Sequence, residues 1–223
     1  MTRPRLLDLF CGAGGASEGY RRAGFDVVGV DIAPQPRYPF TFVRGDALEY
    51  LAAHLGDFDA YHGGPPCQPF CAYRRLGNGV GEGYADLVDA TRTAFGELPA
   101  GVPWVIENVP GAPLRDPVRL CGSSFGLDVR RHRLFESNFE IPTVPCDHGW
   151  QTPRFAQATN RANLRSTVEV GVYRIPLAVQ RTAMGIEWMR LRELSESIPP
   201  AYTEHVGRAM MRAIAARPEL RAA

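Results

Sequence analysis

The stretch that indicates the fold is Leu6-Leu7-Asp8-Leu9-Phe10-Cys11-Gly12-Ala13-Gly14-Gly15. Leu6 to Phe10 is a short apolar run typical of a buried strand, and a glycine-rich turn follows it directly. Residues 16–23 then have the pattern of a helix, which Gly24 ends. A strand, a glycine-rich turn and a helix in this order are typical of the first unit of a nucleotide-binding α/β fold.

Strands and helices continue to alternate through the first half of the chain. Further strands are predicted at Phe25 to Val30, Thr41 to Val43, Phe58 to Tyr61 and Val102 to Ile106, and helices at 47–55 and about 84–96. This alternation predicts a doubly wound, mostly parallel sheet. A more irregular, antiparallel portion is expected to hold strands at Leu120 to Leu127 and Arg133 to Phe139. Helices are expected again at Pro176 to Met184 and from Pro199-Pro200 onward, with Val206, Met210 and Ile214 on one face.

Length and composition limit the class of protein. The 223 residues fit one domain with at most a small appendage. The chain has no apolar run of about 18 residues, so a transmembrane helix is not expected. Five irregularly spaced cysteines without a signal segment argue against a disulfide framework and favour a cytoplasmic protein. All 25 basic residues are Arg, whose planar side chain suits phosphates and base edges.

Carboxylates follow the first three predicted strands. Asp31 comes about 20 residues after the glycine turn, where such folds place an acceptor for ribose hydroxyls. Asp46 would accept a hydrogen bond from a purine amino group or cap the next helix. Together with Asp8, these side chains would repel a phosphate and tolerate a sulfonium. A neutral or cationic adenosine ligand is therefore expected.

Cys67 stands in the stretch Gly64-Pro65-Pro66-Cys67-Gln68-Pro69-Phe70, directly after the fourth strand. Prolines on both sides restrict its backbone. Glu107 follows the fifth strand, so it should reach the same edge of the sheet. A thiol and a carboxyl group facing one cleft are a candidate catalytic pair.

These motifs, taken in order, resemble those of the cytosine-5 DNA methyltransferase family. The matching segments are Asp8 to Gly15, Gly29-Val30-Asp31-Ile32, Gly45-Asp46, Pro65 to Phe70, Glu107-Asn108-Val109, Arg131-His132-Arg133, Met184-Gly185 and Ser195 to Pro200. They cover roughly residues 5–135 and 174–215. The resemblance implies a Rossmann-like, S-adenosylmethionine-dependent methyltransferase domain at 1–137 plus 174–223. Residues 138–173 would be a reduced target-recognition segment.

The resemblance also implies a mechanism. Cys67 would attack carbon-6 of a cytosine flipped out of duplex DNA, while Glu107 holds ring nitrogen 3 and the amino group. Arg131 and Arg133 would orient Glu107 and stabilise the thiolate. The implied cofactor-binding residues are Phe10, Gly12, Ala13, Gly14, Gly15, Asp31, Ile32, Asp46, Ala47, Pro65, Leu87 and Ser197. The implied DNA-binding residues are Pro66, Gln68, Asn108, Arg154, Arg161 and Arg165.

The implied setting is a monomer in the cytoplasm of a bacterial or phage-infected cell, within restriction-modification or phage DNA modification. The chain departs from the family pattern at three positions, which are Cys71, Val129 and Glu196. The first two replace a serine and a glutamine, and Glu196 stands where the cofactor loop usually has an asparagine. The short segment 138–173 predicts a short or relaxed target sequence.

Two other functions fit the same residues. One is methylation of cytosine in RNA, single-stranded DNA or a nucleotide, and the other is a cofactor-binding partner protein without catalysis. Cys146-Asp147-His148 together with Cys121 would supply ligands for zinc, but their spacing matches no standard finger. The sequence therefore predicts no metal and favours a mobile loop or a small specificity lobe in that segment.

Overall fold

The computed structural model describes residues 2–70, 85–152 and 165–217. Seven strands form one sheet in the order β3-β2-β1-β4-β5-β7-β6. Their bounds are β1 (Arg5–Leu9), β2 (Asp26–Asp31), β3 (Thr41–Arg44), β4 (Ala60–Gly63), β5 (Trp104–Asn108), β6 (Val118–Leu120) and β7 (Arg133–Ser137). The pairs among β1 to β5 are parallel, whereas β7 is antiparallel to both β5 and β6. The predicted mostly parallel sheet is confirmed.

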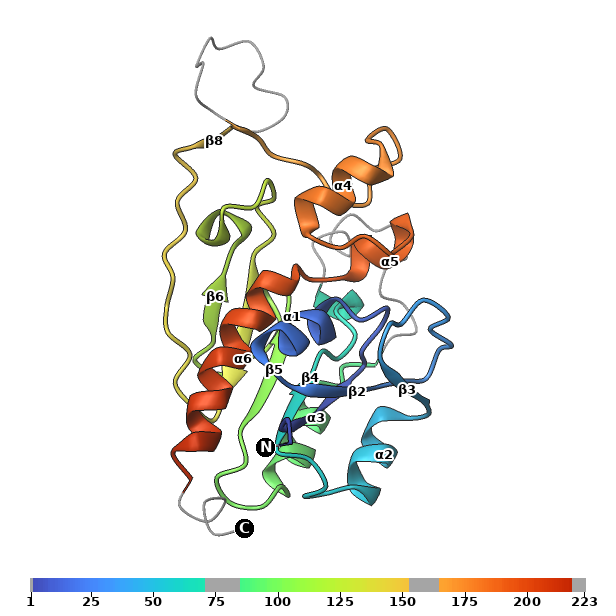
Figure 1. The fold of residues 1–223 in the computed structure, drawn as a ribbon, viewed down its shortest axis with the longest axis vertical. Coiled ribbons are helices and arrows are strands. Elements are labelled where there is room, and N and C mark those ends of the chain that lie inside the picture. Colours follow the sequence, from blue (N-terminus) through green and yellow to red (C-terminus); the bar gives the residue numbers. More distant parts are fainter. Residues whose placement is uncertain (1, 71–84, 153–164, 218–223) are drawn as a thin grey trace.

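Helices cover both faces of this sheet and its carboxyl edge. Helices α1 (Gly15–Ala23) and α6 (Pro200–Ala215) pack side by side on one face, as Figure 1 shows. The opposite face carries α2 (Ala47–Ala53) and α3 (Val88–Gly96), and the edge carries α4 (Leu177–Met184) and α5 (Leu191–Glu196). A separate parallel pair is formed by β8 (Gln151–Thr152) and β9 (Arg165–Ser166). None of the described helices is long and apolar enough to cross a membrane.

Alternation along the strands divides the core between the two faces. Leu6 packs with Tyr20 of α1 and Val206 of α6, whereas its neighbour Leu7 packs with Leu51 of α2 on the other face. All five side chains are fully buried. A parallel sheet covered on both faces requires such continuous apolar strands, which explains why the strand predictions held.

Helix α1 meets α6 at a point where only glycine fits. A Cβ atom on Gly19 would lie 2.1 Å from Oγ1 of Thr203 and 2.2 Å from the carbonyl oxygen of Pro200. Real Cβ atoms do not approach other atoms so closely, so a larger residue would push the helices apart. The C-terminal helix is thereby held against the first one, which completes one side of the core.

Two expectations about elements fail. The strand predicted at Leu120 to Leu127 ends at Leu120, and a short 3-10 helix, η3 (Gly122–Phe125), follows it. A Cβ atom on Gly122 would lie 2.1 Å from the carbonyl oxygen of Val129, so a tight turn replaces the extended chain. Helix α5 was not predicted at all. The predicted helices at 47–55, Pro176 to Met184 and Pro199-Pro200 onward are confirmed within a few residues.

Candidate active site

A cavity of about 420 Å³ lies where the parallel strands end. Its walls come from the loops after β1, β2, β3 and β4, from the end of β5 and from the segment around α5. The volume falls in the range of roughly 300–1,000 Å³ that small-molecule sites occupy. Ligands of open α/β sheets bind at this edge, so the cavity is the candidate active site.

The turn after β1 has a backbone that few residues adopt. Phe10, Gly12 and Gly14 have φ angles of 58°, 50° and 87°. In Phe10, which is not a glycine, a left-handed conformation costs of order 1–3 kcal/mol. Phe10 is half-buried and lines the cavity. The surrounding fold therefore holds the backbone of Phe10 in a conformation that the residue disfavours, and its aromatic ring stays at the cavity wall.

Asp31 is fixed at the end of β2 by backbone groups. Its Oδ2 accepts a hydrogen bond from the N–H of Gly12 at 3.0 Å, and its Oδ1 accepts one from the N–H of Ala33 at 2.8 Å. Each carboxylate oxygen keeps further acceptor capacity. Asp31 lines the cavity, so it is positioned to accept hydrogen bonds from a ligand's hydroxyl groups.

The other two carboxylates of this edge have different roles. Asp46 caps α2, since its Oδ1 accepts from the N–H groups of Leu48 and Glu49 at 2.9 and 3.0 Å, and it also lines the cavity. Asp8 is fully buried. Asp8 nevertheless lines the cavity, so all three carboxylates lie at this edge, with Asp46 exposed, Asp31 half-buried and Asp8 fully buried.

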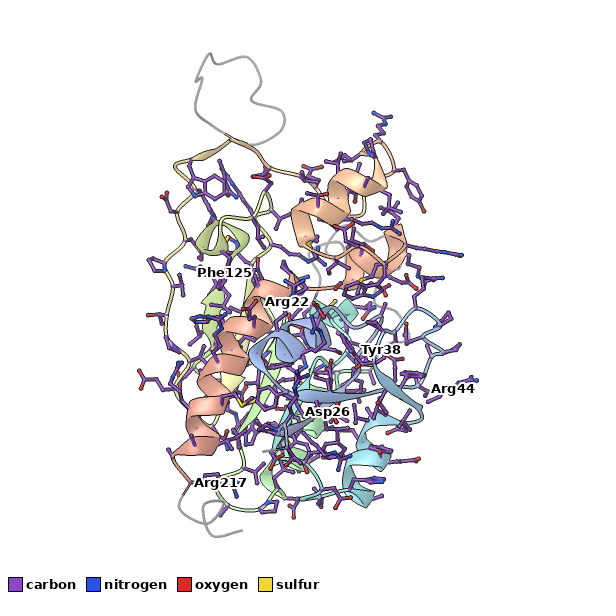
Figure 2. The ribbon with its side chains drawn as sticks, viewed as in Figure 1. Arg22, Asp26, Tyr38, Arg44, Phe125 and Arg217 are labelled. Atoms are coloured by element: carbon purple, nitrogen blue, oxygen red, sulfur yellow. The ribbon has the colours of Figure 1, made fainter. Side chains whose placement is uncertain are left out.

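Asp8 belongs to a buried polar network at the base of the cavity. It accepts a short hydrogen bond from the hydroxyl of Ser17, and its Oδ1 lies 2.8 Å from Nδ1 of His62. Tyr38, labelled in Figure 2, donates its hydroxyl to Oγ of Ser17 at 2.8 Å. These contacts join β1, α1 and β4, and they give the buried carboxylate the partners that its burial requires.

Cys67 lies on the loop that follows β4, and its partly exposed side chain lines the cavity. The loop is held from both sides. The N–H of Gly64 donates to the carbonyl of Leu9 at 3.1 Å, and the amide of Asn108 donates to the carbonyl of Pro65 at 3.0 Å. Neighbouring strands β1 and β5 therefore fix the position of the thiol.

Glu107 of β5 lines the same cavity. Its Oε1 lies 3.1 Å from Nε of Arg133 in β7. Burial raises the pKa of Glu107, and the charges of Arg133, His62 and Arg131 offset that shift only in part. A carboxyl group with a raised pKa keeps its proton to a higher pH, so it can donate a hydrogen bond to a ring nitrogen.

Arg131 is held by the C-terminal part of the chain rather than by Glu107. Its guanidinium donates a short hydrogen bond to the carbonyl of Ser195 in α5, and its own carbonyl accepts from the hydroxyl of Tyr202 at 2.6 Å. Burial lowers the pKa of Arg131 to about 9, which still leaves it charged near neutral pH. Among the described residues, Arg133 forms an ion pair with Glu107, whereas the hydrogen bond of the Arg131 guanidinium goes to Ser195, so the expectation that both arginines orient Glu107 is revised.

The C-terminal segment closes one side of the cavity through a close approach to α1. A Cβ atom on Gly15 would lie 1.9 Å from Oγ of Ser197. Glycine at this position therefore allows Ser197 and Ile198 to line the cavity beside the glycine turn. Glu196 also lines it, and its Oε1 lies 3.7 Å from Nε of Arg192. Glu196, which stands where the family pattern usually has an asparagine, thus faces the cavity.

The cavity brings together much of the predicted site. The predicted residues that line it are Phe10, Gly12, Ala13, Gly15, Asp31, Ile32, Asp46, Ala47, Pro65, Pro66, Cys67, Gln68, Leu87, Glu107, Arg133 and Ser197. Gly14 and Arg131 are outside this set. Asn108 is buried with its amide on Pro65, so its expected DNA contact is corrected to a structural role. Cys71, Arg154 and Arg161 lie outside the described residues, as does the side chain of Arg165.

Several lining residues were not predicted. They include Cys11, Gln35, His62, Arg192, Glu193 and Ile198. The sequence offered a sign of His62, because it is a histidine directly after an apolar run and two residues before Gly64. Arg192 and Glu193 had none, because they belong to the unpredicted helix α5.

Comparisons with known proteins agree with these motifs. The model of the family described as C-5 cytosine-specific DNA methylase matches residues 4–112. The Type II methyltransferase M.XorII of Xanthomonas oryzae pv. oryzae is 44% identical over 87 residues, covering 31% of this chain and 20% of that protein. The Type II methyltransferase M.HgiGI of Herpetosiphon aurantiacus is 30% identical over 124 residues, covering 49% of this chain and 94% of that protein. The matched part is thus about a fifth of the first relative's length.

Solved structures share the fold. A putative DNA modification methyltransferase encoded within a prophage (E. coli) has a TM-score of 0.58 at 16% identity, over 95% of this chain and 99% of that one. The S. pombe Dnmt2 methyltransferase has a TM-score of 0.57 at 14% identity, again over 95% and 99%. With 94% of M.HgiGI aligned at 30% identity and the family model matching residues 4–112, the chain belongs to the C-5 cytosine-specific DNA methylase family.

Proposed function

We propose that this protein transfers a methyl group from S-adenosylmethionine to carbon-5 of cytosine in DNA. The observation that carries the proposal is one cavity lined by Cys67 and Glu107 and also by Phe10 and Asp31. A thiol and a carboxyl group are thus placed beside a wall suited to an adenosine ligand. The catalytic domain would comprise 1–137 plus 174–223, and 138–173 would be the target-recognition segment.

The residues present fit S-adenosylmethionine. Asp31 retains acceptor capacity for ribose hydroxyls, and Phe10 offers an aromatic surface at the wall. The carboxylates of half-buried Asp31 and exposed Asp46 suit a cationic ligand better than a pyrophosphate. When bound there, the cofactor supplies an electrophilic methyl group.

The protein's own residues would activate the base. The thiolate of Cys67 adds to carbon-6 of the cytosine, and the electrons move onto the ring, which makes carbon-5 nucleophilic. Glu107 donates its proton towards ring nitrogen 3 and stabilises the charge that develops there. After carbon-5 has gained the methyl group, a base removes the carbon-5 proton, the bond between Cys67 and carbon-6 breaks, and the ring is restored.

Arg133 and Asn108 would position these two groups. Arg133 fixes the carboxyl group of Glu107 at 3.1 Å and limits the rise in its pKa. Asn108 anchors Pro65 and with it the loop of Cys67. Because the target cytosine must enter a cavity at the sheet edge, it would have to leave the duplex stack. A monomer acting in the cytoplasm remains the expectation.

The proposal is tested with duplex DNA that carries 5-fluorocytosine. Fluorine replaces the proton that must leave carbon-5, so the Cys67 adduct should persist after methyl transfer and survive denaturing electrophoresis. Cys67→Ser should form no adduct and lose at least about 10³-fold in methyl transfer from labelled cofactor. The exposed Glu49→Gln, on α2, is a matched control that should react normally.

The acceptor is tested in the same assay. Duplex DNA, single-stranded DNA, RNA and deoxycytidine nucleotides are compared as acceptors, and duplex DNA should be methylated fastest. Transfer that survives Cys67→Ser unchanged would contradict the chemistry. Preference for RNA or a nucleotide would keep the chemistry and reject the substrate. Cofactor binding without transfer to any acceptor would favour a non-catalytic partner protein.

A further inference from the structure

Four potential metal ligands meet in a part of the molecule outside the active-site cavity. Cys121, His132, Cys146 and His148 each direct one ligand atom to a common point, and these four atoms all lie within 4.8 Å of one another. Cys121 follows β6, His132 precedes β7, and Cys146 and His148 lie on the chain that leads to β8. Three separate stretches of sequence therefore converge on one position.

The distances within this cluster fit a tetrahedral site. Sγ of Cys121 lies 3.2 Å from Nε2 of His148, and Sγ of Cys146 lies 3.5 Å from Nε2 of His132. Around zinc, with its usual bond lengths, a sulfur and a nitrogen ligand are about 3.6 Å apart. The four side chains would therefore need only small adjustments to enclose an ion.

The chemistry of the cluster favours zinc. Two thiols and two imidazoles are a donor set that zinc takes in structural sites with four protein ligands. Neither cysteine is in a disulfide. Sγ of Cys121 is fully buried and accepts a hydrogen bond from the hydroxyl of Ser123 at 3.3 Å, which is the kind of outer contact that holds a ligating thiolate. Two thiolates balance the charge of one Zn²⁺, so the site would be neutral.

We infer that Cys121, His132, Cys146 and His148 bind one zinc ion in a structural site. The sequence spacing alone argued against a metal because the ligands match no standard finger. The tertiary structure supplies the missing geometry by placing the turn after β6 beside the chain that leads to β8. The inference of a zinc site does not rest on the methyl transfer proposed above.

The position of the site suggests what the ion would stabilise. His132 lies between Arg131 and Arg133, so a metal bond to its imidazole would fix the backbone from which Arg133 reaches Glu107. The bonds to Cys146 and His148 would tie down the start of the segment 138–173. Zinc would thus act as a positioning element that joins the arginine motif to the target-recognition segment.

The first test measures metal in the intact protein. Protein purified without chelators from zinc-containing medium should hold about one zinc ion per chain. Replacement by Co²⁺ under reducing conditions should give the intense visible bands of a tetrahedral ion and a thiolate-to-cobalt charge-transfer band. The Cys121→Ser and Cys146→Ser variants should each lose at least about 10-fold in zinc affinity, measured against a chromophoric chelator.

Two variants serve as matched controls. Cys67→Ser removes a thiol outside the cluster, and His54→Ala removes an imidazole that stacks on Tyr50 of α2. Both should retain the zinc. Chelation of the wild-type zinc should also speed amide hydrogen exchange in residues 142–152 more than in β1, which gives a readout that does not depend on a folded variant.

Three results would overturn the inference. The first is a wild-type chain that keeps no zinc after saturation and dialysis. The second is a cobalt complex without the thiolate band. The third is a disulfide between Cys121 and Cys146 in metal-free protein from a reducing cytoplasm. Loss of methyl transfer with normal zinc content would count against the proposed function alone.

Discussion

The apolar core of the parallel part of the sheet extends into its antiparallel end, where Leu120 and Phe135 pack in the same cluster as Leu6, but the chain beyond Ile141 is held by different interactions. In the parallel part, successive residues such as Leu6 and Leu7 pack into two continuous apolar layers. At the antiparallel end, the chain after β7 is held by separate polar contacts, for example from Arg130 to the carbonyl of Gln151 at 2.6 Å and from Ser124 to the carbonyl of Pro145 at 3.0 Å. A change at this end can therefore alter the chain between residues 142 and 152 without unfolding the parallel part of the sheet.

Two buried glutamates on neighbouring strands show the same contrast. Glu107 of β5 pairs in register with Phe135, and Glu136 of β7 pairs with Ile106. Glu107 lines the cavity and has a raised pKa because of burial. Burial also acts to raise the pKa of Glu136, but hydrogen bonds from Arg92 and from the N–H of Arg115 outweigh it, so this pKa is lowered. One carboxyl group is kept ready for proton donation, and the other is a fixed structural anion.

The largest effect is expected from breaking the apolar core of the parallel part. Phe25 is fully buried and meets Tyr20 edge to face, with the ring centroids 6.1 Å apart. Phe25→Ala should lower the free energy of unfolding by about 3–5 kcal/mol, measured by urea denaturation. Ser124→Ala, at the antiparallel end, loses only hydrogen bonds and should cost about 1 kcal/mol. Equal losses for the two variants would remove the contrast between the regions.

A smaller effect is expected at the junction of the two regions. Glu136 accepts from Nε of Arg92 in α3 at 2.7 Å, and Glu136→Gln should cost about 2–3 kcal/mol at neutral pH. Because the folded pKa is lowered, this stabilisation is present above the ordinary glutamate pKa and is lost as the pH falls through the folded pKa. The destabilisation by Glu136→Gln should therefore shrink in acid. Urea denaturation across pH measures it, with the exposed Glu140→Gln as control.

The smallest effect should have the opposite dependence on pH. The raised pKa of Glu107 means that the folded state holds a proton more tightly than the unfolded state, so wild-type stability falls as the pH rises between the two pKa values. Glu107→Gln cannot ionise and should lack this fall. Its stability relative to the wild type should rise with pH, in contrast to Glu136→Gln. Parallel pH curves for the two variants would refute the distinction between them.

Local patterns in the sequence were sufficient for the parallel part of the fold. Strands such as β1 and β2 are buried on both faces and read as apolar runs, and Gly24 ends α1 with a φ of 111° as a helix-terminating glycine does. The pattern failed where contacts distant in sequence decide the structure. The strand predicted at Leu120 to Leu127 includes Gly-Ser-Ser-Phe at 122–125, where the structure has a short 3-10 helix and Gly122 lies against the backbone of Val129. Helix α5 is short, and no periodic apolar pattern in the sequence predicts it.

The active site was predictable to the extent that strand ends determine it. Asp31, Cys67 and Glu107 were predicted from their positions after strands and Phe10 from the family resemblance, and all four line one cavity. Arg192 was missed because its place at the cavity depends on packing across the fold, whereas His62 had a signal in the sequence that was not used. The sequence also did not predict that Arg131 and Arg133 have different partners, because the carbonyl of Ser195 is far from Arg131 in sequence.

The sequence by itself determined the alternation of strands and helices, the glycine turn and the order of the motifs, because each depends on residues close together in the chain. Only the tertiary structure decided which groups meet. It buried Asp8 at the base of the cavity, directed the guanidinium of Arg131 to the carbonyl of Ser195, and gathered Cys121, His132, Cys146 and His148 from three stretches of chain. Such contacts depend on the path of the whole backbone, so spacing along the sequence does not report them.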